Sequence, residues 1–160
     1  MAEGTSANRY GGLVLRIPDP LFDAIRRHAE EAFPNECCGV MLGTIGEGSK
    51  LVSAIHSIEN RFDSPERYHR FLITPDDYRR AEAAARKQKV DILGFYHSHP
   101  NASSIASRYD LDHAFPWFSY LIVSVFDRIY RDHHSWIMEN DRSKFSEEGV
   151  ILEHSLTPSN

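Results

Sequence analysis

The segment GFYHSHPNASSIASRYD, residues 94–110, narrows the possible folds more than any other part of the sequence. It begins in an apolar, aromatic run that is typical of a buried strand. Side chains alternate between the two faces of a strand, so His97 and His99 are expected to point the same way. The same alternation puts Leu93 and Phe95 on that face. The segment therefore predicts a buried strand that ends in two imidazoles on one side.

A loop and a helix start follow the predicted strand. Pro100 has no N–H to give to a neighbouring strand, so it is expected to end the strand. Ser107 to Asp110 then has the Ser-x-x-Asp form of a helix N-terminus. In the first turn of that helix, Asp110 could fold back over the histidines. Two histidines and one carboxylate form the ligand set of a catalytic zinc site, which leaves its fourth position to water.

The residues alone leave a second interpretation open. Ser-x-x-Asp is also an ordinary capping pattern, and a pair of strand histidines is often a surface feature or a satisfied part of the core. The succession of a buried strand, a histidine pair, a proline and an acidic helix start favours the metal site. Simple packing and capping stay as the alternative.

The succession resembles the signature of the JAMM (MPN-plus) metalloproteases, H-x-H-x7-S-x2-D with an acidic residue well upstream. His97, His99, Ser107 and Asp110 match the four positions of the motif. Glu36, in the segment PNECCG, matches the upstream acid.

The resemblance extends over most of the chain, from about residue 13 to residue 152. The segments ECCGVMLG, RFLITP, GFYHSHP and SYLIVSV follow the order of small bacterial members. One departure is Ala106, where many members have a proline. The alanine is expected to loosen the loop without removing a ligand.

The resemblance implies a zinc-dependent metallopeptidase or isopeptidase with one Zn²⁺ per chain, held by His97, His99 and Asp110. It implies that Glu36 is the general base and acid, and that Ser107 donates to the oxyanion. Family members cleave after the C-terminal Gly-Gly tail of ubiquitin-fold proteins, and small bacterial members are associated with sulfur-carrier proteins. We therefore expect a ubiquitin-like or sulfur-carrier substrate, cleaved through zinc-activated water.

Three other functions fit the sequence less well. A deubiquitinase would act on ubiquitin itself, but the segments expected to bind ubiquitin chains are short in this sequence. A non-catalytic MPN scaffold typically lacks the histidine and aspartate ligands that this chain keeps. A zinc deaminase needs His-x-Glu and a Pro-Cys-x-x-Cys pair, a spacing that the adjacent Cys37 and Cys38 cannot supply.

Apolar periodicity and turn signals predict an α/β protein with a mixed sheet flanked by helices. This order agrees with the cytidine-deaminase-like MPN fold that the resemblance implies. The segment from Phe126 to His134 is interpreted as a polar connection. Strands are expected over residues 13–17, 37–42, 51–58, 68–73, 90–99, 120–125, 135–138 and 150–153, and helices over 19–33, 74–88 and 107–115.

The 160 residues are enough for one domain, predicted over 11–154 with a flexible leader at 1–10 and a flexible tail at 155–160. The net charge of −5, without a basic patch, argues against a nucleic-acid partner. No apolar stretch approaches the ~20 residues of a membrane span, and no signal peptide is seen. Cys37 and Cys38 are expected on opposite faces as reduced thiols of a cytoplasmic protein. The oligomeric state stays open.

Overall fold

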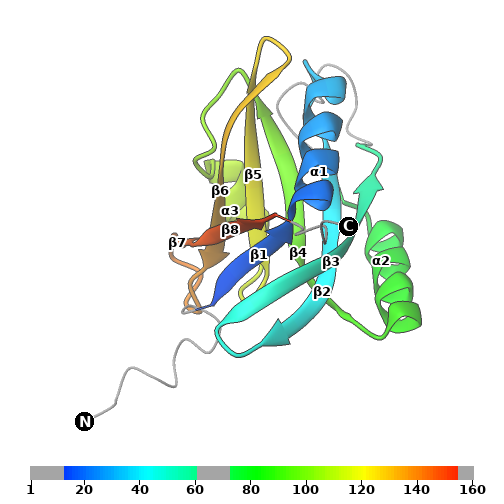
Figure 1. The fold of residues 1–160 in the computed structure, drawn as a ribbon. Coiled ribbons are helices and arrows are strands. Elements are labelled where there is room, and N and C mark those ends of the chain that lie inside the picture. Colours follow the sequence, from blue (N-terminus) through cyan, green and yellow to red (C-terminus); the bar gives the residue numbers. More distant parts are fainter. Residues whose placement is uncertain (1–12, 61–72, 155–160) are drawn as a thin grey trace, which may run out of the picture.

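The computed structural model describes residues 13–60 and 73–154, which form one large sheet with helices on both faces (Figure 1). The predicted leader, tail and most of the strand expected at 68–73 lie outside these residues. In chain order the elements are β1 (Val14–Pro18), α1 (Asp19–Ala32), β2 (Cys38–Gly46), β3 (Ser49–Ile58), α2 (Pro75–Gln88), β4 (Asp91–Pro100), α3 (Arg108–His113), β5 (Ser119–Phe126), β6 (Ile129–Met138), β7 (Phe145–Glu148) and β8 (Val150–Glu153).

The sheet is mixed, as predicted, with the strand order β7-β6-β5-β4-β2-β3-β1-β8. β4 runs parallel to β5, and β1 runs parallel to both β3 and β8. The other neighbours are antiparallel. β4 therefore lies well inside the sheet, and the loops at its carboxyl end can reach both β5 and β6.

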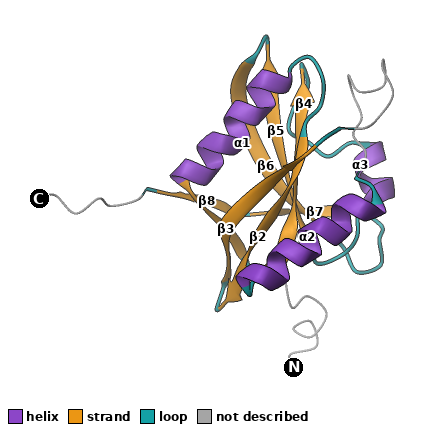
Figure 2. Ribbon diagram, turned by 90° about the vertical axis from the view of Figure 1, so that its right-hand side faces the viewer, coloured by secondary structure: helices purple, strands orange, loops and turns teal. Residues whose placement is uncertain are grey.

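The two long helices cover opposite faces of the sheet (Figure 2). α1 buries Phe22, Ile25 and Ala29 in one apolar cluster, and α2 buries Ala81 and Ala85 in another. Each helix buries residues at three- to four-residue spacing, so one stripe of each faces the sheet. No helix within residues 13–60 or 73–154 is long and apolar enough to cross a membrane.

A β-bulge in β4 corrects the expected placement of Leu93. Met41 pairs with Gly94 and Leu42 pairs with Ile92, so Leu93 has no partner on β2. The extra residue shifts the alternation by one position. Leu93 packs in the cluster under α1, whereas Phe95 packs in the cluster under α2. The prediction that Leu93 and Phe95 share a face was therefore wrong.

The connection predicted from Phe126 to His134 was also wrong, because β6 begins at Ile129 and forms a hairpin with β5. The two turn residues, Asp127 and Arg128, have φ angles of 50° and 71°. Positive φ at both central residues is the feature of a type I′ hairpin turn, which usually holds Asn-Gly or Asp-Gly. An arginine in the second position gave no turn signal.

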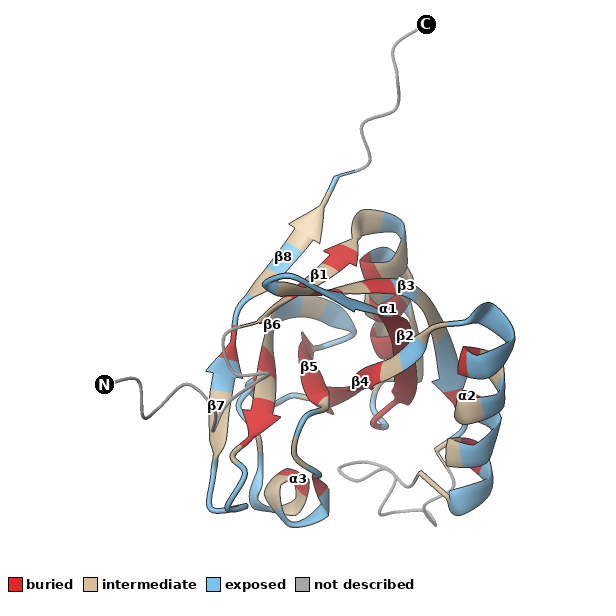
Figure 3. Cartoon of the chain, turned by 90° about the horizontal axis from the view of Figure 1, so that it is seen from below, coloured by how far each residue is buried: buried red, intermediate tan, exposed pale blue. Residues whose placement is uncertain are grey.

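Burial is deepest in the central strands (Figure 3). In β4 every residue from Leu93 to His99 is buried, so the apolar interior continues directly into the histidine pair. Buried polar groups are stable only with polar partners or a bound ion. The end of β4 is therefore the place to look for a site.

Candidate functional site

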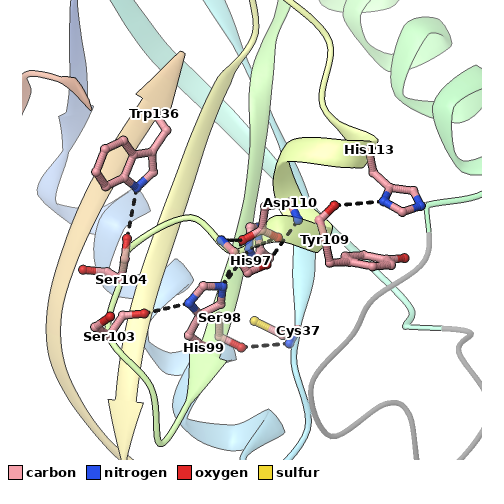
Figure 4. Close-up of polar contacts among 11 residues, drawn as sticks. Cys37, His97, Ser98, His99, Ser103, Ser104, Tyr109, Asp110, His113 and Trp136 are labelled. Atoms are coloured by element: carbon pink, nitrogen blue, oxygen red, sulfur yellow. Dashed lines mark hydrogen bonds and ion pairs between the residues drawn. The ribbon is translucent and has the colours of Figure 1, made fainter. Parts of the chain in front are cut away.

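Three buried side chains converge at the carboxyl end of β4 (Figure 4). The Nε2 atoms of His97 and His99 lie 3.2 Å apart. Asp110 places Oδ1 3.0 Å from His97 Nε2 and Oδ2 3.2 Å from His99 Nε2. One ligand atom from each of the three residues lies within 4.8 Å of the others. The structure thus brings together the three residues that were expected to hold a metal.

α3 delivers Asp110 to the histidines through its N-terminal cap. Ser107 Oγ accepts from the Asp110 N–H at 3.1 Å, and Asp110 Oδ2 accepts from the Ser107 N–H at 2.8 Å. This is the reciprocal capping box that the sequence predicted. The cap and the cluster are not alternatives here, because one carboxylate serves both.

A backbone carbonyl fixes the proton on His99. Its Nδ1 lies 2.7 Å from the carbonyl oxygen of Ser103. A carbonyl oxygen can only accept, so Nδ1 carries the hydrogen. In the neutral ring the Nε2 lone pair then points at His97 and Asp110, the tautomer that binds metals. An imidazole lone pair and a carboxylate directed at one point fit a divalent cation such as zinc.

The loop that carries Ser103 is tied to β6. The hydroxyl of Ser104, 1% exposed, donates to Asp132 Oδ1 at 2.8 Å and lies 2.5 Å from His134 Nδ1. Trp136 donates its indole N–H to the Ser104 carbonyl at 3.0 Å. Sequence reasoning missed these contacts because it placed His134 in a polar connection instead of a strand.

Glu36 lies just before β2 and is 6% exposed. Two hydrogen bonds hold the neighbouring backbone: Cys37 N–H to Ser98 Oγ at 2.8 Å, and Ser98 N–H to the Cys37 carbonyl at 3.1 Å. Burial raises the pKa of Glu36 to about 8, while the positive charge of His99 lowers it and the negative charge of Asp110 raises it. Both charged partners belong to the cluster, so the carboxyl is electrostatically part of the site.

The electrostatics of Asp110 and His99 are coupled. Burial alone raises the pKa of Asp110, but the charge of His97 and hydrogen bonds from both imidazoles hold that pKa well below its ordinary value. Burial lowers the pKa of His99, and the hydrogen bond and charge of Asp110 overcome this and raise it. Asp110 is therefore ionised and attracts positive charge, whether a proton or a metal ion.

Ser107, the remaining residue of the predicted site, is exposed at the N-terminus of α3. Its oxygen accepts from Asp110, and a hydroxyl that accepts one bond can still donate its own proton. The structure thus leaves Ser107 accessible to a ligand beside the cluster.

Residues 18–139 match the family described as prokaryotic homologs of the JAB domain. The desampylase of Haloferax volcanii is 31% identical over 119 residues, which cover 71% of this chain and 81% of that protein. A probable TtuB-protein conjugate cleaving protease of Thermus thermophilus is 29% identical over 105 residues, 66% of each chain.

A solution structure of a protein from Desulfitobacterium hafniense has a similar fold, with a TM-score of 0.77 and 28% identity. The match covers 89% of this chain and 95% of that chain. Family match, relatives and fold agree with one another and with the cluster at the end of β4. The chain belongs to the prokaryotic JAB-domain family and is a JAMM-type hydrolase.

Proposed function

We propose that this protein is a zinc-dependent metallopeptidase or isopeptidase that hydrolyses the peptide or isopeptide bond after the C-terminal Gly-Gly tail of a ubiquitin-like or sulfur-carrier protein. The observation that carries the proposal is the convergence of His97, His99 and Asp110 within 4.8 Å in a buried setting. The names desampylase and conjugate cleaving protease support a substrate in which a protein is joined to a ubiquitin-like modifier.

His97, His99 and Asp110 would hold one zinc ion, and the site would keep an open position for substrate and water. Zinc bound there supplies a Lewis acid, which makes water a nucleophile near neutral pH and polarises the scissile carbonyl. The Ser103 carbonyl supports this role, because it orients the His99 ring and fixes its tautomer. Asp110 supplies the negative charge that a cation at this point needs.

Glu36 would move the proton. Its pKa of about 8 in the metal-free protein is high for a carboxyl, and a nearby dication would bring it down towards neutral by favouring the charged form. A group with a pKa near the working pH can take a proton from water and give it to the leaving amine. The cleavage rate is therefore expected to fall as the pH drops below the pKa of Glu36, because the protonated carboxyl cannot take a proton from water.

Ser107 would donate its hydroxyl proton to the oxyanion that forms on the scissile carbonyl. Its cap fixes it against Asp110, and its exposure leaves it open to the substrate. Loss of one such preorganised donor costs about 3 kcal/mol of transition-state stabilisation in other hydrolases.

We place the catalytic domain at residues 11–154, which contain the whole family match.

We also place the protein in the cytoplasm. The side chains of Cys37 and Cys38 support this, because they pack as free, buried thiols in different clusters, as predicted. Thiols of this kind are typical of a reducing compartment.

The test is cleavage of a ubiquitin-fold sulfur carrier that carries a peptide extension after Gly-Gly, followed by intact mass spectrometry. Ubiquitin with the same extension is the comparison substrate. We expect zinc-loaded wild type to release a product that ends in Gly-Gly. Glu36→Gln should keep zinc and lose cleavage, and His56→Ala, at an exposed histidine on β3, should behave as wild type. Intact substrates with zinc-loaded wild type, or full activity in Glu36→Gln, would contradict the proposal.

A further inference from the structure

The carbonyl that orients His99 lies in a loop, not in a strand or a helix. It belongs to Ser103, in the connection between β4 and α3, and its oxygen lies 2.7 Å from His99 Nδ1. Within residues 101–109 only Ser104 is buried. An exposed loop of this kind has few packing contacts of its own that could fix a carbonyl in place. Other parts of the protein must therefore hold it.

The carbonyls on both sides of Ser103 accept hydrogen bonds from side chains of the sheet. Ser124 Oγ, on β5, donates to the carbonyl of Ala102 at 2.6 Å. The indole N–H of Trp136, on β6, donates to the carbonyl of Ser104 at 3.0 Å (Figure 4). Ser124 is buried, and Trp136 packs against the apolar cluster under α2. With one bond on each side, the Ser103 peptide group has little freedom to turn away from His99.

These contacts follow the register of three neighbouring strands. His99 on β4 pairs with Ser124 on β5, which pairs with Asp132 on β6. Paired residues of neighbouring strands point to the same face, so the three side chains form a row across the sheet. Each of them bonds the loop, because Asp132 Oδ1 accepts from the Ser104 hydroxyl at 2.8 Å. The loop therefore lies over a single row of the sheet, and one member of that row is an expected metal ligand.

Ser104 is the residue through which β6 holds the loop. Asp132, His134 and Trp136 are alternate residues of β6, and all three contact Ser104. Alternate residues of a strand share a face, so the loop is bonded along one side of β6. Metal ligands keep a productive geometry only where bonds of this outer kind lock the groups that orient them. The contacts of β5 and β6 with the loop have the arrangement that such a support needs.

We infer that Ser124 and Trp136 are positioning residues of the metal site. They hold the carbonyls on either side of Ser103, and so they keep the Ser103 carbonyl on His99 Nδ1. The inference rests on the proposed metal site and extends it to β5 and β6, which carry none of the three expected ligands. Loss of either donor should let the Ser103 peptide turn and loosen the His99 ring. Partners of this kind typically contribute about 10- to 100-fold to metal affinity.

The first test measures the zinc affinity of the whole chain by competition with a chromogenic chelator. Ser124→Ala and Trp136→Phe each remove one donor, and the second keeps an aromatic ring. We expect each to bind zinc roughly tenfold more weakly than wild type, and the double variant up to about 100-fold more weakly.

Ser135→Ala is the matched control for this test. Ser135 is a buried serine next to Trp136, but its hydroxyl donates to Glu148 on the opposite face of β6 and does not contact the loop. Urea denaturation of the metal-free proteins gives the loss of stability in each variant. Ser135→Ala should lose about as much stability as Ser124→Ala, since each loses the bond of one buried hydroxyl, and it should keep the zinc affinity of wild type.

The second test reports on the geometry of the site instead of its strength. Cobalt replaces zinc in many sites, and its visible absorption bands depend on the arrangement of the ligands. At saturating cobalt, Ser124→Ala and Trp136→Phe should give spectra that differ from wild type, because the His99 ring is held less firmly. Ser135→Ala should give the spectrum of wild type. A purely structural role of Ser124 and Trp136 would change stability without changing the spectrum of the saturated site.

The results also separate the positioning role from the proposed hydrolysis. Zinc affinity within about twofold of wild type in both single variants, or cobalt spectra identical to wild type, would overturn the inference. An equal loss of affinity in Ser135→Ala would also overturn it, because general destabilisation would then be the cause. The expected affinities and spectra without cleavage of any Gly-Gly substrate would support the positioning role and remove the proposed hydrolysis. Wild type that binds neither metal would overturn both.

Discussion

Replacing Glu36 by glutamine should make the metal-free protein more stable at alkaline pH, even though it removes a residue of the proposed machinery. Burial raises the pKa of Glu36 from 4.5 to about 8 in the folded chain. Between these values the unfolded chain releases the proton and the folded chain keeps it. Stability from this residue is therefore complete below about pH 4.5 and is lost as the pH rises through about 8.

The size of the effect follows from the same two values. Each pKa unit corresponds to about 1.4 kcal/mol, so full ionisation of Glu36 costs the folded state about 5 kcal/mol. That is a large part of the 5–15 kcal/mol that roughly separates folded from unfolded small proteins. Glutamine has nearly the same shape and cannot ionise, so it escapes this loss.

The assay is urea denaturation in EDTA at pH 5 and pH 9. We expect similar free energies of unfolding for wild type and Glu36→Gln at pH 5, and a clearly more stable variant at pH 9. Glu59→Gln, at an exposed position, should follow wild type at both values. Zinc should restore most of the stability of wild type at pH 9, because a dication favours the carboxylate. Parallel pH dependence in wild type and Glu36→Gln would refute the reasoning.

Three further predictions concern the stability of the fold and are checked by urea or thermal unfolding. Ser104→Ala should lower the free energy of unfolding by about 1 kcal/mol, because a buried hydroxyl loses its hydrogen bonds to Asp132 and His134. It should also weaken zinc affinity, because the Ser104 loop holds His99, and unchanged stability and affinity would contradict these contacts. Lys50→Met should lower the free energy of unfolding by about 3–5 kcal/mol, because it removes the cation that pairs with the buried carboxylate of Glu148. Adding Glu148→Gln should restore most of this loss, and no recovery would argue against the ion pair. Thr74→Ala should cost about 1 kcal/mol by removing the cap of α2.

The part of the site that could be predicted depends on short-range rules. His97 and His99 share a face because a strand alternates, and the pairing of β4 with β5 shows no bulge between them. Asp110 turns back because a Ser-x-x-Asp cap fixes its direction. These rules act within a few residues, so the sequence is sufficient to apply them. Glu36 is different, because only the pairing of β2 with β4 brings it near, and no local signal selects it.

The errors came from features that sequence rules describe poorly. The bulge at Leu93 is a property of two paired strands, and one strand alone does not reveal it. The Asp127–Arg128 turn adopts positive φ without the usual glycine, so the first part of β6, up to His134, was interpreted as a connection. The contacts of Ser104 with β6 were lost as a consequence. The positive φ angle of Trp117, 78°, could not be predicted either, because the Lys50 ammonium that bonds its carbonyl lies far away in the chain.

The most direct test of the account is zinc content, measured by elemental mass spectrometry on freshly purified protein. We expect close to one zinc per chain in wild type and in His56→Ala, and almost none in His97→Ala. Circular dichroism of His97→Ala would show that the loss is not one of folding. Wild type that holds no zinc and takes up none on reconstitution, or a His97→Ala variant that keeps it, would contradict the metal site on which the proposed function depends.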